Sequence, residues 1–243
     1  MDWISIAWVT AGLILAGIVK GATGLGYASC ALPFLVTSLG LKPAMAIVLL
    51  PAMATNVAVA LATGHLVETV QRFRALYAAM VPGIAVGIGL LMWISQSMAV
   101  KTLGVLIFGY VAWTLLRPTM QVSGALAVRL QVPVGFLNGV LTGLTGSQVM
   151  PLFPYMMALE LDASRLVQAI NFAVLLCSAI LAAGLLATGI MTLPLLGFSL
   201  LAVLPGLTGV EIGSRLRGRI PSDRFRRLVL WVLLVTGLSM IAR

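Results

Sequence analysis

GIVKGATGLG, residues 17–26, is a glycine-rich stretch within a long apolar run, and GVLTGLTGSQ, residues 139–148, is a second one. Breaking a helix at membrane depth frees backbone N–H and C=O groups that lipid cannot satisfy. Such a break therefore survives only where it is buried in protein or lines a cavity. Paired breaks in two halves of a chain are typical of the binding site of a transporter.

The composition excludes an ordinary soluble domain. The 243 residues are 61% hydrophobic and 9% charged, with a mean hydropathy of +1.13, whereas soluble domains are roughly half apolar and a quarter charged. The net charge of +9 could indicate nucleic acid, but the Lys and Arg residues lie in short loops beside apolar runs, where positive charge sets membrane orientation. We therefore expect a lipid bilayer and no nucleic acid as partner.

Eight apolar runs are long enough to cross a bilayer at about 17–25 residues per helix. They lie near residues 3–40, 43–64, 75–95, 99–116, 132–158, 166–188, 189–210 and 228–242. The first and fifth runs contain the glycine-rich stretches. The sequence predicts an all-α polytopic membrane protein with about eight transmembrane segments, the first and fifth of them broken.

Charge distribution favours breaks that turn back as hairpins. Six arginines between residues 215 and 227 should be cytoplasmic. If the first and fifth segments enter and return, Arg72, Arg74, Arg117, Arg129 and Arg165 join those six on one side, and Lys42, Lys101 and Arg243 lie opposite. Each half then crosses an odd number of times, which makes the halves an inverted repeat.

Matching residues support an internal duplication into halves 1–120 and 121–243 that form one integrated membrane domain. Gly17, Gly21 and Gly24 match Gly139, Gly143 and Gly146 at one constant offset, and Pro82-Gly83 is matched with Pro205-Gly206. The two glycine-rich breaks should then meet near the bilayer midplane.

The chain resembles the sulfite exporter TauE/SafE family over nearly its whole length. The resemblance lies in the two Gly-x-x-x-Gly-x-x-Gly elements, each with a proline a few residues on (Pro33; Pro151 and Pro154-Tyr155), in the Pro-Gly pairs, and in the basic loop before the last span. It implies a multi-pass permease of the bacterial inner membrane that exports a small sulfur-containing anion, sulfite or an organosulfonate.

The residues themselves suggest how an anion would bind. A helix that restarts after a break presents unpaired N–H groups and the positive end of its dipole. Close backbone approach is expected at Gly24, Gly26 and Gly146, and neutral donors at Thr23, Ser29, Thr145, Ser147 and Gln148. The competing interpretation is that the glycines only permit tight helix packing.

Four further polar residues lie in or beside apolar runs, and each has two interpretations. Lys20 is either an anion-attracting or gating charge or a snorkelling lysine at a hairpin tip. Asn56 and Asn171 either bind substrate or join helices. Glu211 either couples transport to protons or pairs with Arg215 four residues on.

Alternative functions remain open at this point. No Walker element is present, so alternating access would be driven by gradients, and a membrane potential favours anion export by about 2.3 kcal/mol per 100 mV. The alternatives are transport of another small solute or a cation, an intramembrane enzyme using Ser147 and His65, and a scaffold that does not transport. We expect no cofactor, and neither a metal nor a disulfide at Cys30 and Cys177. Homo-oligomerisation is left open.

Overall fold

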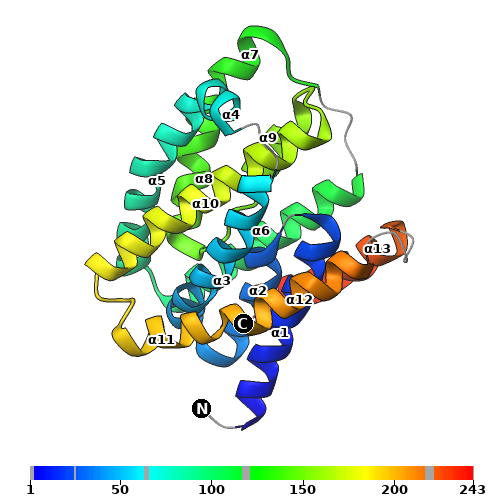
Figure 1. Cartoon of the computed structure of the whole chain (residues 1–243). Helices are drawn as coiled ribbons and strands as arrows, with labels where there is room; N and C mark the ends of the chain where they lie inside the picture. Colours follow the sequence, from blue (N-terminus) through cyan, green and yellow to red (C-terminus); the bar gives the residue numbers. More distant parts are fainter. Residues whose placement is uncertain (1–2, 25, 63–65, 117–120, 217–221, 243) are drawn as a thin grey trace.

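The computed structural model describes residues 3–24, 26–62, 66–116, 121–216 and 222–242, with side chains at 58–62 and 222–229 excepted. This part of the chain is entirely helical apart from turns, which confirms the expected all-α class. The helices are α1 (Trp3–Thr23), α2 (Tyr27–Leu39), α3 (Leu41–Ala62), α4 (Leu66–Arg72), α5 (Arg74–Trp93), α6 (Gln96–Leu116), α7 (Gly124–Arg129), α8 (Gln131–Thr145), α9 (Leu152–Ala158), α10 (Ala163–Ala187), α11 (Leu193–Leu201), α12 (Val203–Leu216) and α13 (Ser222–Ile241) (Figure 1).

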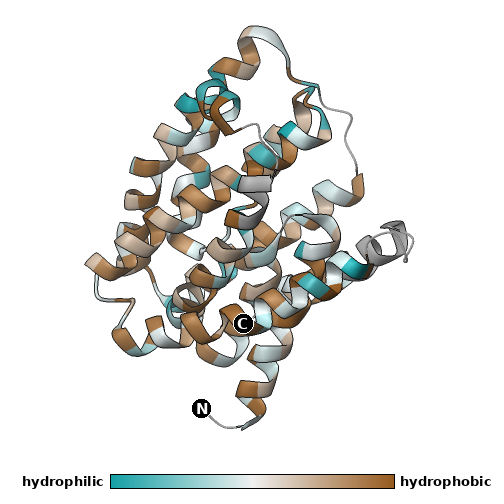
Figure 2. Cartoon of the chain, in the orientation of Figure 1, coloured by the Kyte–Doolittle hydropathy of each residue, from teal (hydrophilic) through white to brown (hydrophobic). Residues whose placement is uncertain are grey.

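Six helical segments of the described residues are long and apolar enough to cross a membrane. They are α1, α5, α6, α10, the continuous pair α7–α8 and the continuous pair α11–α12. Hydrophobic residues run along these helices, and hydrophilic ones gather around α4 (Figure 2). The protein is therefore a multi-pass membrane protein. The two runs expected to be broken each hold one long and one short helix, α1 with α2 and α8 with α9.

Only the last glycines of each glycine-rich stretch lie where a helix ends, and the earlier glycines lie inside the helix. Gly17 and Gly21 lie inside α1, and the chain leaves the helix only after Thr23. Gly24 and Gly26 have φ angles of 81° and 85°, in the left-handed region that disfavours a Cβ. In the second half α8 continues through Gly143 to Thr145, and Gly146 ends it with φ 75°.

The helical glycines place helices of opposite halves in direct backbone contact. A Cβ on Gly139 would lie 3.0 Å from the Cα of Gly83, and one on Gly143 would lie 2.9 Å from the Cα of Gly87. Small residues allow membrane helices to approach this closely. Since both contacts advance in the same sense, α8 and α5 run parallel.

The other pair of helices repeats this contact residue for residue. A Cβ on Gly17 would lie 2.8 Å from the Cα of Gly209, and one on Gly21 would lie 2.1 Å from the carbonyl oxygen of Val210. The first helix of each half therefore packs on the third long element of the other. Gly209 takes in the α1–α12 contact the place that Gly83 takes in the α5–α8 contact. The sequence match of Pro82-Gly83 with Pro205-Gly206 pairs Gly83 with Gly206 instead.

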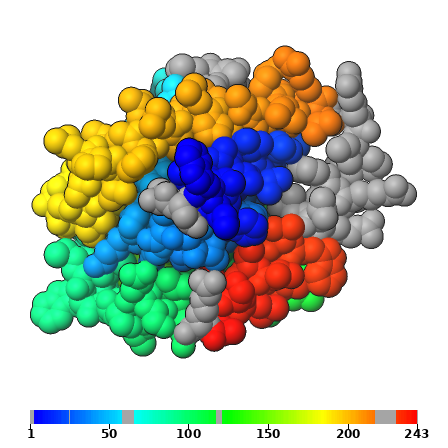
Figure 3. Space-filling view, turned by 90° about the horizontal axis from the view of Figure 1, so that it is seen from below, coloured from blue at the N-terminus to red at the C-terminus, as the bar shows by residue number. Residues whose placement is uncertain are grey.

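Two further helix pairs pack against one another, α3 with α10 and α6 with α13. A Cβ on Gly104 of α6 would meet Met240, whereas one on Gly237 of α13 would meet Ile107, so α6 and α13 run antiparallel. Figure 3 views the molecule from the end that carries the N-terminus. In this view α12 (orange) lies against α1 (blue), and α13 (red) lies beside α6 (green).

Most charged side chains of the described part gather at one end of the molecule. Arg165 Nε lies 2.9 Å from Glu68 Oε1, and Gln131 Nε2 donates to the carbonyl oxygen of Arg72 at 3.0 Å. These contacts bring the starts of α8 and α10 to α4, at the top of Figure 1, opposite the N-terminus. At the other end the turn at Gly40, next to Lys42, lies against Gln96 near Lys101.

Candidate functional site

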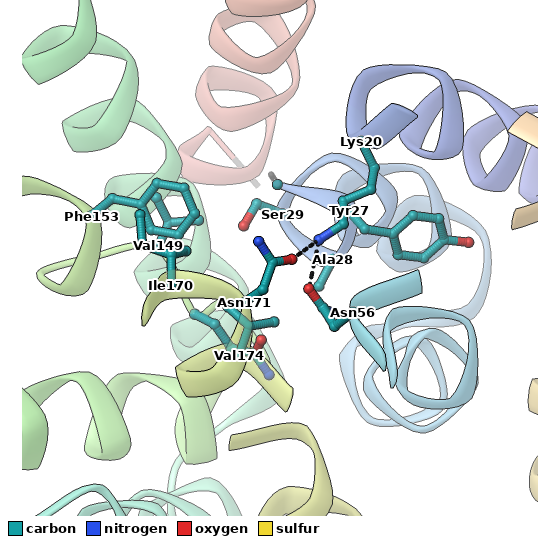
Figure 4. Close-up of a pocket in the computed structure, with 12 residues that line it drawn as sticks. Lys20, Tyr27, Ala28, Ser29, Asn56, Val149, Phe153, Ile170, Asn171 and Val174 are labelled. Atoms are coloured by element: carbon teal, nitrogen blue, oxygen red, sulfur yellow. Dashed lines mark hydrogen bonds between the residues drawn. The ribbon is translucent and has the colours of Figure 1, made fainter. Parts of the chain in front are cut away.

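Lys20 is a buried lysine held by two asparagines from other helices. Its side chain is 3% exposed. The Nζ atom donates a hydrogen bond to Asn56 Oδ1 of α3 at 2.5 Å and another to Asn171 Oδ1 of α10. Figure 4 shows the three side chains converging from three helices. Lys20 is therefore not a snorkelling residue at an exposed hairpin tip.

The amide groups of both asparagines are fixed with their oxygens toward Lys20. Asn56 Nδ2 donates to the carbonyl oxygen of Ala52 at 2.6 Å. Asn171 Nδ2 donates to Val167 O at 2.8 Å and to Gly24 O at 3.3 Å. The bond to Gly24 ties the backbone break to α10, so the break, the lysine and the two asparagines form one unit.

The ammonium group has no buried carboxylate partner among the described residues. Their four acidic side chains, Glu68, Glu160, Asp162 and Glu211, are all exposed. Desolvating a charge without a counter-charge costs several kcal/mol, and such residues inside membranes are usually functional. Neutral amide oxygens can orient the ammonium but cannot neutralise it, so an anion would complete the site.

The N-terminus of α2 borders the same cavity. Gly26, Tyr27, Ala28 and Ser29 line it together with Lys20. The first helical hydrogen bond runs from Cys30 N to Gly26 O at 3.1 Å, so the preceding N–H groups have no partner within the helix. These N–H groups and the helix dipole favour an anion. We call this space the Lys20 cavity.

The Lys20 cavity is small as it stands. Its volume is about 10 Å³, room for about one water molecule. On the side away from the lysine its wall is apolar, made by Val149, Phe153, Ile170 and Val174 (Figure 4). Any larger ligand requires this wall to move.

Six of the residues proposed from the sequence line this cavity. They are Lys20, Gly26, Ser29, Asn56, Gln148 and Asn171. Gln148 donates through Nε2 to Ser178 Oγ at 3.0 Å, and its Oε1 has no hydrogen-bond partner in the described part of the chain. Gly24 joins the unit through its carbonyl oxygen. Thr23 lies outside the Lys20 cavity and lines a larger neighbouring one.

The second break contributes less to the cavity than the first. Thr145 Oγ1 donates to Leu141 O at 2.7 Å and accepts from Ser147 N at 3.2 Å. The Thr145 hydroxyl and the Ser147 N–H are therefore used in local hydrogen bonds that involve the backbone. A Cβ on Gly146 would lie 2.8 Å from Met45 Cγ, which shows close packing there. These three residues do not line the Lys20 cavity.

Glu211 lies away from this unit. It is exposed and accepts a hydrogen bond from Arg215 Nε at 2.7 Å, the local pairing expected from its spacing. His65 lies outside the described residues. The apolar lining residues were not predicted from the sequence. Of these, only Tyr27 and Val149 could have been proposed, because each directly follows a glycine-rich stretch.

Neither the curated proteins nor the solved structures contain a match to the chain. A family model described as "Sulfite exporter TauE/SafE" matches residues 9–240, which include all thirteen helices except the ends of the first and last. The resemblance found in the sequence is thereby confirmed: the chain belongs to the sulfite exporter TauE/SafE family of membrane transporters.

Proposed function

We propose that this protein is a secondary transporter that exports a small sulfur-containing anion, sulfite or an organosulfonate, and binds it at Lys20. The observation that carries the proposal is the buried ammonium group whose only described hydrogen-bond partners are two neutral amide oxygens. The α2 N–H groups at Gly26 to Ser29 supply further donors. An oxyanion would accept from both and neutralise the lysine.

The halves 1–120 and 121–243 form, in this proposal, an inverted repeat of hairpin plus three spans, about eight segments in all. Equivalent glycine contacts in the α1–α12 and α8–α5 pairs support the repeat. The antiparallel α6–α13 pair supports inversion, because a two-fold axis along the membrane normal would leave equivalent helices parallel. Since each half packs its first helix on the other half, the two cannot form separate domains.

Alternating access at paired broken helices follows from this arrangement. The Lys20 cavity holds no more than about one water as it stands, and relative movement of the halves would enlarge it and expose it to either side in turn. The arginine-bearing end is the cytoplasmic one by the positive-inside rule. A bacterial inner membrane, negative inside, would then drive an anion outward.

Two competing functions fit the geometry less well. A cation site is disfavoured because a cation in this cavity would face the ammonium of Lys20. An intramembrane enzyme built on Ser147 is disfavoured because the residue lies outside the Lys20 cavity.

The proposal is tested by anion flux into proteoliposomes under an imposed potential. We expect Lys20→Met to reduce flux of sulfite and methanesulfonate by about tenfold or more, equivalent to about 1.4 kcal/mol of binding. Lys101→Met, an exposed lysine at the other end of the molecule, is the matched charge control and should transport normally. Full flux in a folded Lys20→Met protein would overturn the proposal.

A further inference from the structure

A second, larger cavity adjoins the Lys20 cavity. Its volume is about 330 Å³, within the range of about 300–1,000 Å³ typical of small-molecule sites. Gly26, Ser29 and Val149 line both spaces. A thin wall made by the start of α2 and by Val149 therefore separates the two. We call the second space the apolar cavity.

The described lining of the apolar cavity is unsuited to a bare oxyanion. Val19, Met157, Leu230 and Leu233 supply aliphatic surface, and Tyr110 and Trp113 supply aromatic rings. No charged side chain lines it among the described residues. Thr23, Ser29 and Thr114 add hydroxyl groups to the lining, but aliphatic and aromatic surface predominates. An inorganic anion therefore loses hydration against most of this wall, whereas a hydrocarbon chain gains from burial there.

The apolar cavity lies on the arginine-bearing side of the Lys20 cavity. Tyr110 and Trp113 belong to the last turns of α6, and Thr23 ends α1. Met157 lies in α9, and Tyr155 OH of the same helix donates to Ala127 O of α7, two residues before Arg129, at 2.7 Å. A molecule entering from that end would meet the apolar cavity before it reached the lysine.

We propose that the apolar cavity holds the hydrocarbon part of an organic sulfonate whose charged head is bound at Lys20. This inference rests on the proposed function and selects the organosulfonate class over inorganic sulfite. Movement of Val149 and of the α2 start would join the two spaces into one site. The substrate would then lie with its head at the lysine and its tail toward Tyr110 and Trp113.

The test is a series of n-alkyl sulfonates from methanesulfonate to hexanesulfonate in the same proteoliposomes. Burying a methylene stabilises by about 0.8 kcal/mol, so the half-saturating concentration should fall about fourfold per added carbon. Val19→Phe, which fills the apolar cavity, should remove this dependence on chain length. Leu15→Phe, one turn earlier in α1, exposed and outside both cavities, should retain it.

A measurement that does not depend on turnover uses a native thiol. Cys30 lines the apolar cavity, and Cys177 is fully buried. In a Cys177→Ala background, hexanesulfonate should slow modification of Cys30 by a thiol reagent, and methanesulfonate should not. This inference would be overturned if methanesulfonate is transported, the half-saturating concentration does not change along the sulfonate series, and hexanesulfonate does not protect Cys30. That result would leave the Lys20 site standing. Sulfite flux without any sulfonate flux would likewise overturn this inference alone, whereas absence of both sulfite and sulfonate flux would refute the proposed function.

Discussion

Lys20 and Asn171 are 151 positions apart in the chain, yet the ammonium of one donates a hydrogen bond to the amide oxygen of the other. The contact joins the first helix of one half to the central helix of the other, at the level where the backbone of α1 breaks. Asn171 also holds Gly24 through its Nδ2 atom. One asparagine thus positions both the charge and the break.

Replacing this amide by a carboxylate should abolish anion binding while preserving the fold. In Asn171→Asp the carboxylate would neutralise Lys20, so the attraction for a substrate anion would disappear. We expect sulfonate flux to fall by about tenfold or more, equivalent to about 1.4 kcal/mol, in a protein that still folds although the Nδ2 bonds to Val167 O and Gly24 O are lost. Asn171→Leu, which leaves the lysine charged but loses its orientation, should keep more flux. Equal flux in Asn171→Asp and the wild type would argue against an anion site at Lys20.

The helix contacts predict opposite effects of alanine at two glycines of α5. A Cβ on Gly87 would lie 2.1 Å from the carbonyl oxygen of Val140, so Gly87→Ala should overpack the α5–α8 contact and destabilise by about 1–3 kcal/mol. Gly89 has no atom within 4 Å of a built Cβ. Gly89→Ala should therefore be neutral or stabilise by about 0.5–1 kcal/mol. Thermal unfolding in detergent separates the two.

The α1–α12 pair has a glycine contact like that of Gly87 in the α5–α8 pair. Alanine substitutions in both pairs therefore test the proposed repeat. Gly213→Ala, whose Cβ would lie 2.2 Å from Ile18 O, should behave as Gly87→Ala does. Gly197→Ala, with open space around it, is its control. Tolerance of Gly213→Ala together with a severe effect of Gly87→Ala would mean that the two contacts are not equivalent.

The inverted topology predicts the sidedness of single cysteines in a background lacking Cys30 and Cys177. Cysteines at Arg129 and Arg215 should react with an impermeant maleimide from the cytoplasmic face, because positive charge is retained there. Cysteines at Lys42 and Lys101 should react only from the opposite face. If the cysteines that replace Arg129 and Arg215 were labelled from different faces, the antiparallel pairing of α6 and α13 would be contradicted.

Asp162 should make stability depend on pH at the start of α10. The backbone N–H of Arg165 donates to its carboxylate at 2.9 Å, and the Arg165 side chain pairs with it at 2.5 Å. These bonds lower the pKa of Asp162 below its ordinary value. A lowered carboxyl pKa contributes stability above the unfolded-state pKa of about 3.9, and the contribution is lost as pH falls through the folded-state value.

Melting temperatures across acidic pH check this contribution. Asp162→Ala should lower the melting temperature at neutral pH, because the α10 N-cap is lost, and its difference from the wild type should shrink toward pH 3. Glu160→Ala, two residues earlier and exposed, is the control and should follow the wild type. A difference that stays constant with pH would show that the carboxylate charge contributes nothing.

The sequence by itself determined the membrane class, the family and the chemistry available at the breaks. The length of an apolar run and its scarcity of charge can be read from local composition. A run long enough to cross the bilayer is then predicted to be a transmembrane helix. Lys20, Asn56 and Asn171 could be singled out for the same reason, since polar side chains in apolar runs need partners. Their roles stayed undecided, because partners are not visible in local sequence.

Only the tertiary structure decided which residues meet. It assigned Gly17, Gly21, Gly139 and Gly143 to helix contacts and left Gly24 and Gly26 at the break beside the cavity. It also placed Gln148 in the lining of the Lys20 cavity, whereas Thr145 and Ser147 bond the local backbone and lie outside it. Matching motifs suggested two equal breaks, but a cavity forms where side chains from distant helices converge. That convergence depends on the register of α1 on α12 and of α8 on α5, which no single segment encodes.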